Sequence, residues 1–130
     1  MQNIIKCTAG ATGAVVSYFF GGWTMLLQTL VIFIALDYVF GVLTAAYLGE
    51  LNSKKGFKGI AKKAMIFMIV AVAHLLDQVI GSGYFIRDAV ICFYIANEVI
   101  SIVESASKTN LPIPDKLKKI ANILIEGEIS

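Results

Sequence analysis

Three long apolar stretches, separated by short polar segments, dominate the pattern of the chain. They cover residues 24–48, 64–80 and 85–103. A helix needs about 20 mainly apolar residues to cross a bilayer, and a backbone in hydrocarbon must pair its amide groups within its own segment. The pattern therefore predicts three transmembrane helices. The polar segment 49–63 is predicted to be a loop, and residues 81–83 a tight turn that makes the second and third helices antiparallel neighbours.

The two ends of the chain have weaker patterns. Residues 1–23 form a glycine-rich segment whose apolar part, residues 9–20, is too short as a helix to cross a hydrocarbon core of about 30 Å. We favour an interfacial or partly inserted helix there and leave a fourth crossing open. In the tail, residues 104–130, an apolar stripe comprises Ile113, Leu117, Ile120 and Leu124. This stripe predicts a short amphipathic helix, either resting on an anionic membrane surface or solvated.

Composition suits lipid better than water. Hydrophobic residues make up 58% of the 130 residues and charged residues 15%, whereas soluble domains have about 45–50% and about 25%. A chain of this size cannot bury so much apolar surface by itself. The predicted fold class is therefore an all-α membrane protein. It is one integral membrane domain, residues 1–130, with three or four transmembrane helices and a short basic amphipathic C-terminal helix.

All lysines except Lys6 fall into two clusters, one between the first two spans and one in the tail. The first comprises Lys54, Lys55, Lys58, Lys62 and Lys63, and the second Lys108, Lys116, Lys118 and Lys119. Lysine-rich loops stay on the cytoplasmic side of a membrane. Two crossings separate the clusters, so both fall on the same side. We therefore predict a multi-pass protein with the loop 49–63 and the C-terminal tail in the cytoplasm.

The first span carries a charge in its middle, on a face that otherwise holds small residues. Spaced four residues apart, these positions are Asp37, Gly41, Ala45 and Gly49. A charge at that depth costs at least about 2.5–3.5 kcal/mol, and small residues at this spacing let another helix approach closely. We predict that this face packs helices and mediates self-association. Packing against the other spans of the same chain is the alternative interpretation.

Two further groups of polar residues lie within or beside the other spans. The group near the turn between the second and third spans comprises His74, Asp77, Arg87 and Asp88. We expect it to form an ion cluster at the outer boundary, where it would fix the hairpin. The polar edge of the third span comprises Arg87, Tyr94, Asn97, Glu98, Ser101 and Ser105. That edge suits a helix facing a polar interior, or hydrogen-bonded contacts between helices of one chain.

The sequence contains no pattern that is typical of an enzyme active site. With one histidine and two cysteines, Cys7 and Cys92, the chain offers no metal-ligand or disulfide pattern. The glycines lack the spacing of a phosphate-binding loop, and no nucleophile–base–acid set is present. We predict no enzymatic activity, no cofactor, no metal and no nucleic-acid partner. Cys92 lies within an apolar run and is expected to be buried.

Several segments, taken in order, form a specific set. They are Leu36-Asp37-Tyr38-Val39-Phe40-Gly41-Val42-Leu43, Gly56-Phe57-Lys58-Gly59-Ile60-Ala61-Lys62-Lys63, Arg87-Asp88-Ala89-Val90, Phe93-Tyr94-Ile95-Ala96-Asn97-Glu98, and Leu111-Pro112-Ile113-Pro114 followed by Lys116-Leu117. Over roughly residues 21–126, their order and spacing resemble those of the phage-lysis and toxin-secretion holins of bacteria and their phages. Each segment alone would be weak, whereas the set is fairly specific.

The resemblance implies a function. Holins collect in the bacterial cytoplasmic membrane, form homo-oligomers and open lesions that release a cell-wall-degrading endolysin or, in some cases, a toxin; they are not enzymes. The expected partners are therefore the lipid bilayer, further copies of the chain, and an endolysin or toxin as the functionally coupled protein. Two other functions stay open at this point. One is a small membrane transporter or channel, and the other is a non-lethal holin regulator or membrane anchor.

Overall fold

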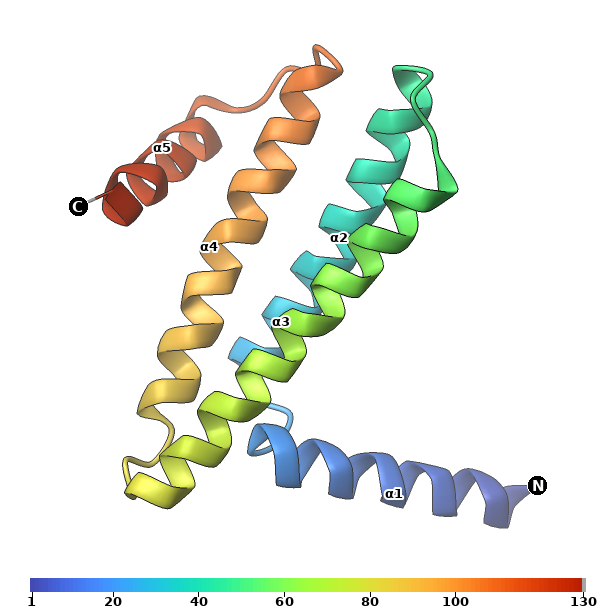
Figure 1. Ribbon diagram of the computed structural model, residues 1–130, viewed down its shortest axis with the longest axis vertical. Coiled ribbons are helices and arrows are strands. Elements are labelled where there is room, and N and C mark those ends of the chain that lie inside the picture. Colours follow the sequence, from blue (N-terminus) through green and yellow to red (C-terminus); the bar gives the residue numbers. More distant parts are fainter. Residues whose placement is uncertain (130) are drawn as a thin grey trace.

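The computed structural model describes residues 1–129, which form five helices and no strand (Figure 1). They are α1 (Gln2–Phe20), α2 (Met25–Tyr47), α3 (Ser53–Ile80), α4 (Phe85–Lys108) and α5 (Asp115–Ile129). Among these residues, α2, α3 and α4 are the helices that are long and apolar enough to cross a membrane. The predicted all-α fold, with three candidate spans and a shorter C-terminal helix, is confirmed.

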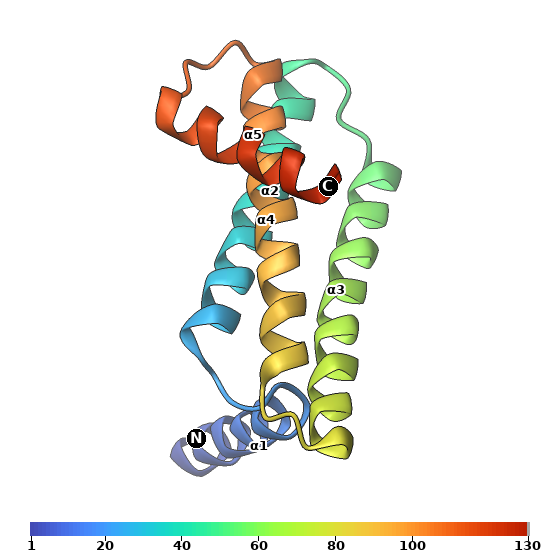
Figure 2. The ribbon, with the colours of Figure 1, turned by 90° about the vertical axis from the view of Figure 1, so that its left-hand side faces the viewer.

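The three candidate spans form a bundle in which α4 packs against both α2 and α3, while α2 and α3 contact each other little. We call the end with the α3–α4 turn, residues 81–84, the hairpin end. The opposite end, with the α2–α3 connection at residues 48–52 and the last turn of α4, is the basic end. Helices α3 and α4 meet at the hairpin end and separate toward the basic end (Figures 1 and 2). The bundle is therefore closed at one end and more open at the other.

Two spans are longer than the apolar pattern predicts. Helix α3 begins at Ser53, within the predicted loop 49–63, and α4 continues beyond residue 103 to Lys108. Asn52 caps α3, because its side-chain oxygen accepts a hydrogen bond from a backbone amide of the first turn at 2.8 Å. Lysine is also a good helix former, so the helix does not end where its hydrophobicity ends. Most of the predicted loop is thus the first turns of α3.

A dry core fills the hairpin half of the bundle. Its buried members are Leu27, Leu30, Ile34, Val70 and Ile91, with Phe20 and Phe67 packed against them. Many other large apolar side chains face outward, such as Leu43 and Phe93. Soluble proteins rarely expose so much contiguous apolar surface, so this exterior suits lipid. Cys92, which we expected to be buried, is exposed on this surface, because it points away from the other helices.

The N-terminal helix α1 runs across the hairpin end rather than along the bundle (Figures 1 and 2). Its last turns reach the bundle, where Val16 and Phe20 pack against the core. Gly21 then ends the helix in the left-handed conformation, with φ of 77°, which glycine adopts without a steric cost. This crosswise placement favours the interfacial interpretation of residues 1–23 over a fourth crossing.

The C-terminal helix α5 folds back against the last part of α4 (Figure 2). Asn110, with φ of 61°, turns the chain after α4. Pro112 and Pro114 lie within the connection, where they cannot continue a helix. Ala121 is 3% exposed, so a small residue lies at the contact between the two helices.

Candidate functional site

Three ionisable side chains meet inside the bundle, one from each candidate span. The amino group of Lys63 on α3 lies 2.6 Å from Oδ2 of Asp37 on α2 and 3.0 Å from Oε2 of Glu98 on α4. Asp37 is 8% exposed and Glu98 is 4% exposed. We call these three residues the ion triad. It joins all three helices through charge-assisted hydrogen bonds, which are the stronger kind.

The positions of the triad residues along their helices explain why they meet. Asp37 lies ten residues before the end of α2, Lys63 ten residues after the start of α3, and Glu98 ten residues before the end of α4. An α-helix rises 1.5 Å per residue, so each lies about 15 Å from its helix end at the basic end. Equal distances from the same end of an antiparallel bundle mean equal depth. The triad therefore lies well inside the candidate spanning region.

The triad is stable only as a complete set. Without the lysine, two carboxylates would face each other and repel, and losing one partner of a buried ion pair typically costs about 3–5 kcal/mol. Exchanging all members of such a set for apolar side chains of similar size is often neutral or stabilising. The triad is thus poor evidence for extra stability. It makes the closed arrangement of α2, α3 and α4 depend on Lys63.

A cavity of about 390 Å³ lies between α2, α3 and α4 and leads from the basic end to the triad. We call it the vestibule. Its wall includes Asp37, Gly41, Ala45, Lys63, Ser101 and Ser105. Glu50, Lys55 and Lys108 line its outer part. A cavity of this size with many polar groups can hold ordered water.

Two contacts of α2 leave the vestibule open between them. The ring of Tyr38 lies against α3, where a Cβ at Gly56 would be 3.4 Å from the Tyr38 hydroxyl. The hydroxyl of Thr44 donates a hydrogen bond to the carbonyl oxygen of Ser105 on α4 at 3.3 Å. At Gly41 an added Cβ would meet nothing within 4 Å. Small residues therefore give the vestibule its width.

The predicted helix-packing face of α2 turns toward the vestibule. Asp37, Gly41 and Ala45 line it, and Gly49 lies past the end of α2, in the connection to α3. In this arrangement Asp37 is buried while Gly41 is exposed to the vestibule, so the small residues border a cavity rather than a close contact with another span. Self-association through this face stays a prediction, and it would require α3 to move away from α2.

Between the triad and the buried polar residues of the hairpin end, the interior of the bundle is apolar. Ile34 lies one turn from Asp37 toward the hairpin end, Val70 two turns from Lys63, and Ile91 two turns from Glu98. All three belong to the dry core. In the described part of the chain, the polar interior therefore reaches the triad from the basic end and stops there.

A second polar cluster holds the hairpin end together. The carboxylate of Asp77, which is fully buried, accepts hydrogen bonds from the Ser82 hydroxyl at 2.6 Å and from the backbone amides of Ile86 and Arg87 at 2.9 and 2.8 Å. Those amides belong to the first turn of α4, and backbone amides in the first turn of a helix have no acceptor within the helix itself. Asp77 on α3 thus caps α4 across the turn.

Arg87 connects the hairpin to α1. Its Nη1 donates a hydrogen bond to the carbonyl oxygen of Phe20 at 2.9 Å, and its Nη2 donates to Asp88 at 2.8 Å. The guanidinium also lies over the ring of Tyr84, 4.3 Å from its centroid. At 3% exposure it is buried rather than extended toward the membrane surface. Its long-range partner is the end of α1, and the boundary position of the cluster stays a prediction.

His74 completes this cluster. Its ring stacks on that of Tyr84, and its Nε2 lies 3.0 Å from the Gln78 amide nitrogen. The other ring nitrogen, Nδ1, is buried and has no hydrogen-bond partner among residues 1–129. The structure therefore brings together the four residues of the expected boundary cluster. Within the described chain, Arg87 and Asp88 are the only ion pair among them.

The polar edge of α4 is divided between these regions. Glu98 belongs to the triad, and Ser101 and Ser105 line the vestibule. Tyr94 packs against the dry core. Asn97 is half-buried, and no residue in the range 1–129 offers its amide a hydrogen bond. The edge therefore faces a polar interior over its second half.

Sequence reasoning missed the role of Lys63, which it assigned to the cytoplasmic lysines. Lys54, Lys55, Lys58 and Lys62 are indeed exposed on the first turns of α3, and Lys116, Lys118 and Lys119 on α5. Both clusters lie toward the basic end (Figure 2). The signal that could have identified Lys63 is its depth in the bundle. It lies as far from its helix end as the carboxylates of Asp37 and Glu98 lie from theirs. Among residues 1–129 no group of side chains could hold a metal ion.

Comparison with known proteins identifies relatives along most of the chain. A family model described as the bacteriophage holin family matches residues 14–126, which include the triad, the vestibule and most of α5. An uncharacterised protein of Listeria innocua is 48% identical over 120 residues, covering 92% of this chain and 86% of the relative. One of Halalkalibacterium halodurans is 40% identical over 129 residues, covering 95% and 96%. One of Clostridium perfringens is 40% identical over 118 residues, covering 90% and 89%. No solved structure matches the chain.

Proposed function

Since the chain belongs to the bacteriophage holin family, whose members form membrane pores and are not enzymes, we propose that it forms lesions in a bacterial cytoplasmic membrane. In this proposal the chains accumulate as homo-oligomers. The lesions then let a cell-wall-degrading endolysin, or a secreted toxin, leave the cytoplasm. The similar proteins named above are uncharacterised, so the proposal rests on the family and on the physical chemistry of the site.

The observation that carries the proposal is the ion triad at mid-depth of three apolar helices. Charged side chains exposed to hydrocarbon are costly, so the triad residues have two tolerable environments. One is the closed bundle, where Lys63 pairs with Asp37 and Glu98. The other is a water-filled lesion, where each charge is solvated. The same three residues can therefore stabilise a closed bundle and provide the polar surface that an open lesion needs.

The vestibule supports the direction of the change. It reaches the triad from the basic end, and α2 and α3 contact each other little. Movement of α3 away from α2 would expose Asp37, Gly41 and Ala45 together. That face could then pack against another copy through its small residues, or line a lumen through its charge. Accumulation as closed bundles, followed by exchange of intramolecular for intermolecular contacts, is the proposed sequence.

The vestibule also favours one alternative function, a transporter or channel for small ions. A polar cavity that ends at charged residues in mid-membrane is typical of solute sites. Such sites commonly use broken helices, however, and α2, α3 and α4 contain no proline. In liposomes, flux of small ions without release of large dyes would favour this alternative over lesion formation.

The test is inducible expression of the chain in a bacterium that also makes a cytoplasmic endolysin without its own export signal. Membrane potential and culture density are followed together. We expect abrupt depolarisation after a delay, and lysis only when both proteins are present. A catalytically inactive endolysin is the matched control, and should leave depolarisation intact while removing lysis. Unchanged potential and growth at high expression would overturn the proposal.

A further inference from the structure

Helix α5 leaves a second cavity between itself and α4, which shares Glu104 and Lys108 of its wall with the vestibule. It measures about 410 Å³, within the range of about 300–1,000 Å³ usual for small-molecule sites. Residues from both helices line it: Ile100, Val103 and Ser107 from α4, and Lys118, Asn122 and Ile125 from α5. We call it the tail cleft. Ala121 of α5, which is 3% exposed, also lines the cleft.

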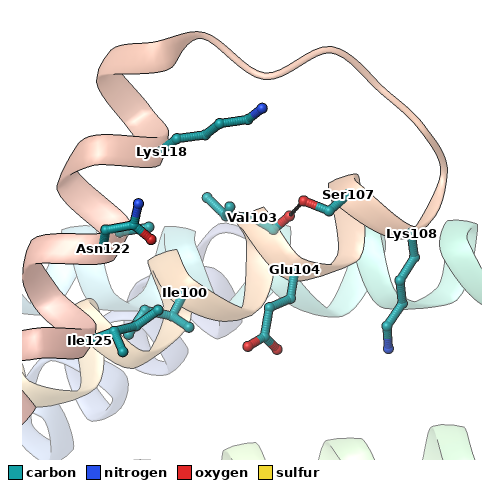
Figure 3. A pocket seen from close by; sticks show the side chains of 9 residues that line it. Ile100, Val103, Glu104, Ser107, Lys108, Lys118, Asn122 and Ile125 are labelled. Atoms are coloured by element: carbon teal, nitrogen blue, oxygen red, sulfur yellow. Dashed lines mark hydrogen bonds between the residues drawn. The ribbon is translucent and has the colours of Figure 1, made fainter. Parts of the chain in front are cut away.

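The lining of the tail cleft is amphipathic and ordered along its length. Ile100 and Ile125 lie close together at one end, whereas Lys118 extends across the other end, near the connection between the helices (Figure 3). Glu104 and Lys108 of α4 also line the cleft, and their side chains point away from α5 (Figure 3). No carboxylate in the described chain pairs with Lys118. One end is thus apolar and the other carries an unpaired positive charge.

This gradient matches the direction of a membrane boundary. Ile100 lies eight residues before the end of α4, about 12 Å deeper than the basic end. Lys118 lies in the first turns of α5, near the connection that leaves α4. A phospholipid has the same order, with a charged phosphate at the surface and acyl chains below it. Lysines near the surface attract anionic lipids specifically.

We propose that the tail cleft binds an anionic phospholipid, with the phosphate at Lys118 and the first part of an acyl chain against Ile100 and Ile125. Asn122 supplies a second polar group toward the headgroup. The other exposed lysines of α5, Lys116 and Lys119, raise the local positive charge without lining the cleft. The lipid would hold α5 against α4. This binding does not depend on lesion formation, so the two proposals can fail separately.

The test is native mass spectrometry of the full chain, reconstituted in an equal mixture of phosphatidylglycerol and phosphatidylcholine and then released from the bilayer. We expect the chain to retain phosphatidylglycerol in preference. Lys118→Gln should reduce that retention roughly fivefold, the effect of about one surface lysine. Lys119→Gln is the matched control, because it removes the same charge from the same helix outside the cleft, and it should retain the lipid.

A second variant tests the apolar end of the tail cleft. Val103→Phe should fill the cleft and reduce retention with every lysine intact, whereas Val79→Phe, at an exposed position of the hairpin end, should not. Circular dichroism of each variant checks that the helices are intact. Equal loss for Lys118→Gln and Lys119→Gln would overturn the proposal in favour of diffuse attraction. Equal retention of the two lipids would overturn the preference for an anionic lipid. A chain that retains phosphatidylglycerol and yet leaves membrane potential and growth unchanged at high expression would leave this proposal standing and overturn the proposed lesion formation.

Discussion

The two halves of the bundle are built from the same three helices but are held together differently. At the hairpin end, Leu30, Val70 and Ile91 are fully or nearly fully buried in one apolar cluster, and Asp77 accepts hydrogen bonds from the first amides of α4. At the basic end, α2 and α3 scarcely touch, and a polar cavity separates them. The first half combines an apolar core with the hydrogen-bonded Asp77 and Arg87, whereas closure of the second half depends on Lys63. The difference indicates which half can open while the other keeps the helices together.

The comparison is tested most strongly at Lys63. We expect Lys63→Ala to destabilise the closed bundle by about 3–5 kcal/mol, because it leaves Asp37 and Glu98 buried without a partner. Thermal unfolding in detergent would measure the loss, and the delay before depolarisation in cells should shorten. Lys62→Ala is the matched control, since Lys62 is exposed and should change neither. A normal melting temperature for Lys63→Ala would show that the triad does not hold the basic end.

A variant with an apolar triad separates stability from opening. Asp37→Leu, Lys63→Met and Glu98→Leu together should restore thermal stability to near that of the parent chain, because buried ion sets are often replaceable by apolar side chains. If the charges are needed to line a lesion, the same chain should accumulate in the membrane without depolarising it. Lesions formed by this variant would remove the triad from the mechanism.

Substitution of Asp77 at the hairpin end should lower the stability of the protein without changing how it depolarises the membrane. Asp77→Ala leaves the amides of Ile86 and Arg87 without their acceptor, and an unsatisfied buried donor costs about 1–3 kcal/mol. We expect a lower melting temperature and faster hydrogen exchange in the first turn of α4. Asp88→Ala is the control for hydrogen exchange, because it removes an acceptor of Arg87 but leaves the cap by Asp77 in place, so the amides of Ile86 and Arg87 should stay protected. If Asp77→Ala shortened the delay before depolarisation as much as Lys63→Ala does, the two halves of the bundle would not differ in their role in opening.

A smaller effect is expected where α1 joins the hairpin end. Gly21 has φ of 77°, and a Cβ there would lie 2.7 Å from both Nη1 of Arg87 and Cε1 of His74. We expect Gly21→Ala to cost about 1–2 kcal/mol and to release α1, seen as faster proteolysis within residues 2–20. Gly13→Ala, in open space within α1, should leave proteolysis unchanged or slow it. Equal proteolysis of the two variants would mean that α1 is not held through Gly21.

The number of spans follows from the sequence because hydrophobicity is a local property of each segment. The contacts of Lys63 and Arg87 do not, because both depend on residues far away in the chain. Arg87 bonds to the carbonyl of Phe20, 67 residues earlier, and no local pattern indicates that pairing. Lys63 was predicted to lie in a loop because the apolar stretch begins only at residue 64, whereas α3 itself begins at Ser53. Once the bounds of α3 are known, the distance of Lys63 from the helix end can be compared with those of Asp37 and Glu98, and the match indicates that the three residues can meet.

The smallest effect on stability, and the sharpest test of how copies associate, is expected at Gly41. A larger side chain there enters the vestibule, where a Cβ meets nothing within 4 Å, so Gly41→Leu should change stability by no more than about 0.5 kcal/mol. If the α2 face mediates association after α3 moves away, the leucine should block close approach of a second helix, and amine-reactive crosslinking between chains in the membrane should fall. Val39→Leu, on the exposed opposite side of α2, should leave crosslinking unchanged. Undiminished crosslinking in Gly41→Leu would move the contact between copies to the outward faces of the bundle, and the vestibule would then serve opening alone.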